Sequence, residues 1–70
     1  MSSKLQLMNL FNEFFGHRHY IYKYEIENIK ALYDMATENY GIKTTPEEVK
    51  ECINLFITTL KQVRHAEVVF

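Results

Sequence analysis

The chain of 70 residues contains one cysteine, one proline and two glycines, and each scarcity excludes a class of protein. The lone cysteine, Cys52, cannot form an internal disulfide, which excludes the disulfide-rich secreted scaffolds and favours a reducing, cytoplasmic compartment. Gly16 and Gly41 lie too far apart in the sequence to form a glycine-rich phosphate loop. Because no Pro-, Gly- or Ser-rich linker divides the chain, we predict a single domain over residues 1–70.

Long apolar runs and an excess of one charge are also missing. No run approaches the length of about 20 residues that a bilayer-spanning helix needs. The apolar residues near the N-terminus are interrupted by polar ones, and no small-residue cleavage site follows them, so we expect neither a signal peptide nor a membrane partner. The chain has eight Lys and Arg and nine Asp and Glu, so its net charge is close to zero. This charge balance makes nucleic acid a less favoured partner.

Apolar and aromatic residues, by contrast, are abundant. Hydrophobic residues make up 47% of the chain, which includes five Phe and five Tyr. A domain of this size buries only about 60% of the surface that its unfolded chain exposes, so its interior is too small for all of these side chains. We therefore predict that some apolar surface meets a partner, and we expect a homodimer in solution.

A first helix is predicted to begin at Ser2 or Ser3, either of which can cap it, and to end at Gly16 in the left-handed conformation. Leu5 and Leu10 lie outside its main apolar stripe and predict burial on two sides. The stripe itself follows helical spacing and consists of Leu7, Met8, Phe11, Phe14 and Phe15.

A second helix is predicted from Tyr22 to Tyr40, ending at Gly41, because its apolar residues repeat at steps of four and three. Just before it, Tyr20, Tyr22 and Tyr24 alternate at the period of a strand. No second strand is apparent with which this segment would pair, so we predict a connector there.

The third predicted helix has the strongest start signal. Thr45 is a capping residue, Pro46 occupies the first helical position, and Glu48 stands where the acidic residue of a capping box belongs. The helix is expected to run to about His65. Its apolar seam consists of Val49, Ile53, Phe56, Leu60 and Val63, with Cys52 beside it.

These elements predict an all-α fold, a small three-helix bundle made of a short N-terminal helix and a longer antiparallel helical hairpin. A short link joins the second helix to the third, and short links favour antiparallel neighbours. The first helix would then close the bundle.

Catalytic groups are scarce. His17 and His19 are spaced as metal ligands, and Cys52 or His65 would have to complete the set. Because CxxC and HExxH motifs are absent, we predict no metal or other cofactor. A metal-dependent enzyme is the third and least favoured functional hypothesis. Cys52 lies on an apolar helix face, where a thiol packs as a small hydrophobe. We predict no catalytic residues and do not expect an enzyme.

Residues 17–24 interleave basic and aromatic side chains, the composition of both protein hot spots and single-stranded nucleic-acid platforms. The near-zero net charge favours a protein partner. In a structural alternative, Tyr22 and a neighbour enter the core with their hydroxyls reaching water. The predicted contact residues are Phe15, Arg18, Tyr20 and Tyr24.

We therefore expect a small non-enzymatic regulator, inhibitor or adaptor that binds another protein through an apolar and aromatic helical surface. The alternative is a DNA-binding regulator of helix-turn-helix type, in which the third helix would read DNA. Its first turns carry Glu47, Glu48 and Glu51, whose carboxylates would repel phosphates. The richness in Asn, Lys, Ile, Tyr and Glu is typical of AT-rich coding and favours a phage or low-GC bacterial origin.

Overall fold

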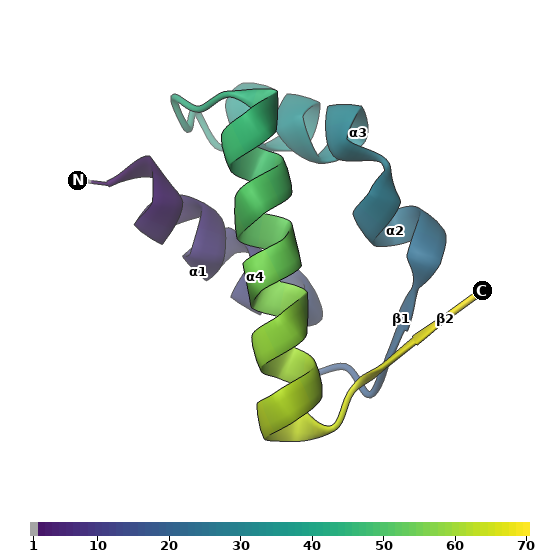
Figure 1. Cartoon of the computed structure of the whole chain (residues 1–70). Helices are drawn as coiled ribbons and strands as arrows, with labels where there is room; N and C mark the ends of the chain where they lie inside the picture. Colours follow the sequence, from purple (N-terminus) through teal and green to yellow (C-terminus); the bar gives the residue numbers. More distant parts are fainter. Residues whose placement is uncertain (1) are drawn as a thin grey trace.

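The computed structural model describes residues 2–70 and is mostly helical (Figure 1). Two short strands, β1 (Tyr20–Tyr22) and β2 (Glu67–Val69), pair in parallel. The helical class is thus confirmed for most of the chain, whereas a three-helix bundle is not. In chain order the helical elements are α1 (Ser3–Phe15), α2 (Lys23–Glu27), α3 (Ile29–Asp34), the π-helical segment η1 (Met35–Asn39) and α4 (Pro46–Arg64).

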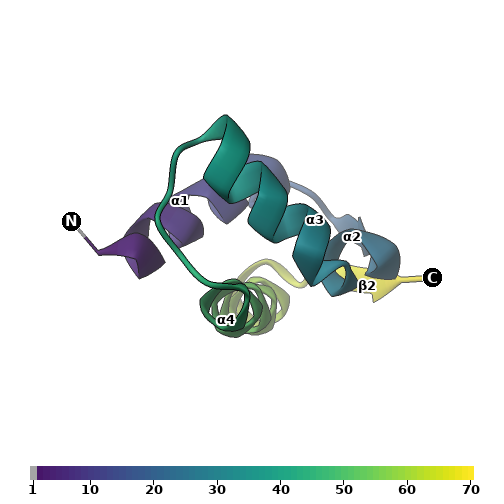
Figure 2. The ribbon, with the colours of Figure 1, turned by 90° about the horizontal axis from the view of Figure 1, so that it is seen from above.

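The long helix α4 carries much of the core. Figure 2 looks down its axis and shows α1 and α3 on the same side of it. The ring of Phe56 packs against that of Phe11 in α1, with 6.3 Å between centroids. Among the described residues, no helix is both long and apolar enough to cross a membrane. The buried residues of α4 are Val49, Cys52, Ile53, Phe56, Ile57 and Leu60.

The predicted seam of α4 is correct except at its C-terminal end. Val49, Ile53, Phe56 and Leu60 are buried, but Val63 is 70% exposed. Val63 lies in the last turn of α4, next to the point at which the chain leaves the helix at His65. Helical spacing alone does not show where the packing partners of a helix end.

Helix α1 begins at the predicted place, but Ser2 at its N-cap makes no side-chain capping hydrogen bond, and Ser3 donates to Glu48 instead. The end of α1 also differs from the prediction. Gly16 has φ −62°, the right-handed region, so the predicted left-handed cap is wrong. A glycine is needed here for a different reason, because a Cβ would come within 2.5 Å of the Asn12 carbonyl oxygen. The prediction of burial on two sides holds for Leu10, which is 4% exposed, but not for Leu5, which is 53% exposed.

The predicted second helix is broken at Asn28, which has ψ 78°. Its side-chain oxygen accepts a hydrogen bond of 3.1 Å from the Ala31 N–H and so caps α3. Asparagine favours such caps over helix interiors because its side chain competes with the backbone for hydrogen bonds. The end of the helical stretch is as predicted, since Gly41 follows it with φ +63°.

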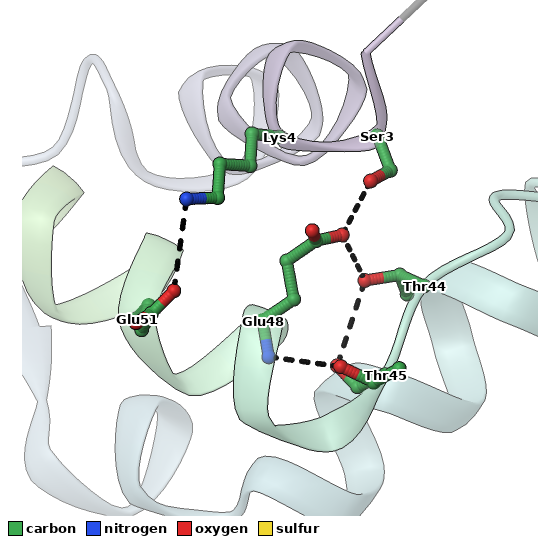
Figure 3. A network of polar contacts seen from close by, with 6 residues as sticks. All are labelled: Ser3, Lys4, Thr44, Thr45, Glu48 and Glu51. Atoms are coloured by element: carbon green, nitrogen blue, oxygen red, sulfur yellow. Dashed lines mark hydrogen bonds and ion pairs between the residues drawn. The ribbon is translucent and has the colours of Figure 1, made fainter.

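The start of α4 confirms Thr45 as its cap, but only half of the predicted capping box forms. Thr45 Oγ1 accepts a hydrogen bond of 3.2 Å from the Glu48 N–H. The Glu48 carboxylate does not return to Thr45; it accepts hydrogen bonds from the hydroxyls of Ser3 and Thr44 (Figure 3). Glu48 thereby joins the N-terminal ends of α1 and α4, because a hydroxyl on a neighbouring helix lies within its reach.

The strand pair corrects the prediction of a connector over residues 17–24. Tyr20 pairs with Glu67, Ile21 with Val68, and Tyr22 with Val69. The partner strand belongs to the C-terminal apolar tail, far from β1 in sequence, and parallel strands require a long crossover, here the helices between them. Ile21 is fully buried and Val68 packs against the core, so this sheet covers one edge of the hydrophobic interior.

Candidate functional site

The most conspicuous surface lies where β1 enters α2 and β2 runs beside it. Successive side chains of a strand point to opposite faces, so Tyr20 and Tyr22 face solvent while Ile21 between them is buried. Tyr24 follows in the first turn of α2. The exposed fractions are 60% for Tyr20, 44% for Tyr22, 71% for Tyr24 and 97% for Phe70. We call these four residues the aromatic face.

Contacts among neighbouring side chains arrange the aromatic face. The rings of Tyr22 and Tyr24 stack at 5.8 Å with an interplanar angle of 19°. The Lys23 ammonium lies 4.7 Å from the centroid of the Phe70 ring, a cation–π contact that links α2 to the residue after β2. Rings held in this way lose less rotamer freedom when a partner covers them.

An ion pair supports the aromatic face from its edge. Arg18 Nη1 lies 2.9 Å from Glu25 Oε1, and Glu25 Oε2 accepts a hydrogen bond of 2.9 Å from the Tyr22 N–H. The hydrogen bond from Arg18 is the main reason that the pKa of Glu25 lies below its ordinary value, and that of Arg18 above it. The pair therefore stays ionised at neutral pH and fixes β1 relative to α2.

The structure places the four predicted contact residues differently from one another. Tyr20 and Tyr24 are exposed, as a contact surface requires. Arg18 is only partly exposed; it pairs with Glu25, and its guanidinium lies 5.8 Å from the centroid of the Phe15 ring. Phe15 is 6% exposed and belongs to the core, so its prediction as a surface residue is wrong. The chain folds back over it through the turn that leads to β1.

Two residues of the aromatic face are absent from the predicted set. The helical repeat assigns Tyr22 to the second helix, although its alternation with Tyr20 indicates a strand that exposes both. Phe70 lies beyond any periodic segment, so its position beside Lys23 follows only from the pairing of β2 with β1. The alternative in which Tyr22 enters the core is wrong, because Tyr22 is 44% exposed.

Of the groups considered for metal binding, His19 and His65 line one hollow, together with Glu67. His17 and His19 are exposed, and within residues 2–70 no three His, Cys, Asp or Glu side chains gather in a way that would hold a metal. Cys52 is buried as predicted, at 3% exposed, and burial raises the pKa of its thiol. A protonated, covered thiol is a poor nucleophile.

A hollow of about 580 Å³ opens beside the start of α4. Its polar lining includes Glu48 and the two residues whose hydroxyls donate to the Glu48 carboxylate, Ser3 and Thr44 (Figure 3). The hydrogen bonds from Ser3 and then Thr44 keep the pKa of Glu48 below its ordinary value. The Glu48 carboxylate that lines the hollow is therefore already engaged by two donors, and Lys43 belongs to the same lining.

No protein-family model matches the chain, and no curated protein or solved structure is significantly similar to it. Any function is therefore inferred from the surface of this chain itself.

Proposed function

We propose that this protein is a non-enzymatic regulator, inhibitor or adaptor that binds another protein through the aromatic face. The observation that supports the proposal is the exposure of four aromatic side chains on adjoining elements of so small a protein. Tyrosine and phenylalanine are enriched at the centres of protein interfaces, because each brings a large contact area with few rotatable bonds.

The charges around the aromatic face favour a protein over a nucleic acid. Arg18 is paired with Glu25, and Lys23 lies 3.5 Å from a carboxylate oxygen of Glu27. These pairs neutralise the two cations nearest the tyrosines, and affinity for nucleic acid depends on cations that neutralise phosphates. An exposed aromatic surface whose nearest cations are already paired is better suited to binding a protein than a nucleic acid.

The start of α4 likewise disfavours the helix-turn-helix alternative. Glu47 and Glu48 lie in its first turn, where a recognition helix would approach bases and phosphates. We further propose that the protein acts in the cytoplasm, where the unpaired thiol of Cys52 would stay reduced.

The test is the double variant Tyr20→Ala/Tyr24→Ala. Both side chains are mostly exposed, so the circular dichroism spectrum and melting midpoint should stay nearly unchanged. Binding to a partner, identified by affinity capture from native lysate and then titrated in purified form, should weaken by about 1 kcal/mol or more per hot-spot residue.

The matched control is Leu55→Ala/Val63→Ala, which removes two exposed apolar side chains from α4 and leaves the aromatic face intact. Control and wild type should bind alike. Equal binding by the tyrosine variant would refute the proposal. Capture of DNA fragments, with an affinity that falls steeply as salt rises, would instead support the DNA-binding alternative.

A further inference from the structure

The strand β2 has one paired edge and one open edge. The Glu67 N–H donates a hydrogen bond of 2.9 Å to the carbonyl oxygen of His19, so the backbone groups of Glu67 face β1. Backbone groups alternate in direction along a strand, so those of Val69 also face β1 and those of Val68 point the opposite way. Among the described residues, no backbone group bonds to Val68 on that side.

The outer edge of β1 is obstructed at Tyr22. The Tyr22 N–H, which points away from β2, is already bonded to Glu25 Oε2 at 2.9 Å. Arg18 holds that carboxylate in place, and the chain turns into α2 at the next residue, Lys23. A further strand therefore meets a less obstructed edge beside β2 than beside β1.

The sheet has only two strands and depends on its packing against the core through Ile21 and Val68. Val68 and Val69 are β-branched residues that favour strands, and both remain partly exposed. An open edge of this composition is a template for another strand.

We propose that β2 pairs with β2 of a second copy of this chain, antiparallel, about a two-fold axis beside Val68. In an antiparallel ladder, a hydrogen-bonded pair forms when two opposed residues each turn their N–H and C=O toward the other. Val68 offers both groups on its open side, so the same residue from two copies makes such a pair. The edge is thus complementary to itself, as a two-fold interface requires, and a four-stranded sheet with the order β1-β2-β2-β1 results.

The register of the paired strands is compatible with a second copy as the occupant. The two-fold register places Glu67 opposite Val69 of the second copy, and Ala66 opposite Phe70. No like charges are directly opposed in this register, and a formal net charge of −1 per chain adds little repulsion.

The dimer would also join the two aromatic faces. Tyr20, Tyr22 and Val69 lie on the side of the sheet away from the core. In the four-stranded sheet, these residues from both copies would form one continuous surface. The dimer does not depend on the proposed function, because it is formed by the backbone of β2 and needs no other partner.

The experiment measures the mass of the purified protein by sedimentation equilibrium from micromolar to submillimolar concentration, with no partner present. The wild type should be dimeric. Val68→Pro should be monomeric with an unchanged helical circular dichroism spectrum, because proline removes the outward N–H and leaves the hydrogen bonds to β1 in place. Val68→Thr, which keeps the backbone donor and a β-branched shape, should remain dimeric.

Two charge variants of Val69 test the register of the paired strands. They also test the proposed dimer if Val68→Pro does not fold. Val69→Glu places a carboxylate opposite Glu67 of the other copy at two symmetric positions and should raise the dissociation constant by about tenfold. Val69→Lys should not raise it. A monomeric wild type, or a dimer equally tight in both Val69 variants, would overturn the proposal. Partner capture plays no part in this measurement, so its result is distinguishable from a failure of the proposed function.

Discussion

Arg18 donates a hydrogen bond of 2.9 Å to Glu25, and this ion pair joins the turn after α1 to the first turn of α2. The second oxygen of Glu25 accepts from the Tyr22 N–H. One carboxylate therefore holds three features together: the chain that covers Phe15, the outer edge of β1, and the start of α2. Both side chains are about three-quarters covered, at 28% and 24% exposed.

The pair makes stability depend on pH. The pKa of Glu25 is lower in the folded protein than in the unfolded chain, chiefly because Arg18 bonds to the carboxylate. Its contribution is therefore fully present above the unfolded value of about 4.3 and is lost as the pH falls through the folded value. Glu25→Gln should lower the free energy of unfolding at pH 7 by about 1 kcal/mol and reduce the loss of stability in acid.

Urea denaturation at neutral and acidic pH would measure both effects. Glu27→Gln is the control, because the Glu27 side chain is 61% exposed and its pair with Lys23 contributes little. Equal stability of wild type and Glu25→Gln at neutral pH would contradict the role given to the ion pair.

The cap of α4 gives a second prediction. Thr45→Ala removes the acceptor for the Glu48 N–H and should cost about 1 kcal/mol, whereas Thr45→Asp retains an acceptor and should cost little. Equilibrium denaturation would compare the two. A change below a few tenths of a kcal/mol in the alanine variant would show that the cap is dispensable.

A third prediction concerns the core. Phe56 is 7% exposed and packs against Phe11, so Phe56→Ala should cost about 3 to 5 kcal/mol. Its neighbour Leu55 is 60% exposed, and Leu55→Ala should change stability by no more than about 0.5 kcal/mol. Thermal melting of both variants is the measurement, and similar midpoints would contradict the assignment of the buried side of α4.

The left-handed residue after η1 gives a fourth prediction. Gly41 has φ +63°, and a Cβ at this position would meet no atom within 4 Å, so the cost of a side chain there is conformational and not steric crowding. Gly41→Ala should destabilise by about 1 kcal/mol, and Gly41→Asn by less, because asparagine tolerates this region. Denaturation midpoints in the reverse order would argue against a left-handed residue at this position.

The aromatic face is only partly predictable from the sequence. Tyr20 and Tyr24 are correctly expected on the surface because they interleave with cations in a short segment. Phe15 carries a helical signal that does not distinguish a core position from one left exposed at a helix end. Phe70 lies in no periodic segment, so the sequence pattern does not predict its position.

The sequence by itself determined the features made by residues within four positions of one another. The start of α4 at Thr45, the buried series from Val49 to Leu60 and the turn at Gly41 are of this kind. Each depends on a local hydrogen bond, a local backbone preference or the helical repeat, and these act in the same way in any surrounding structure. The cap at Asn28 is equally local, but the longer apolar repeat around it obscured it.

Only the tertiary structure decided which distant segments meet. The pairing of β1 with β2, the bond from Ser3 to Glu48 and the position of Phe70 over Lys23 join residues far apart in sequence. Such contacts depend on the packing of the helices between them, because ordering the intervening chain costs entropy that local signals do not offset. A strand of three residues has too weak a preference of its own, so its partner is set by the packed core on which both strands lie.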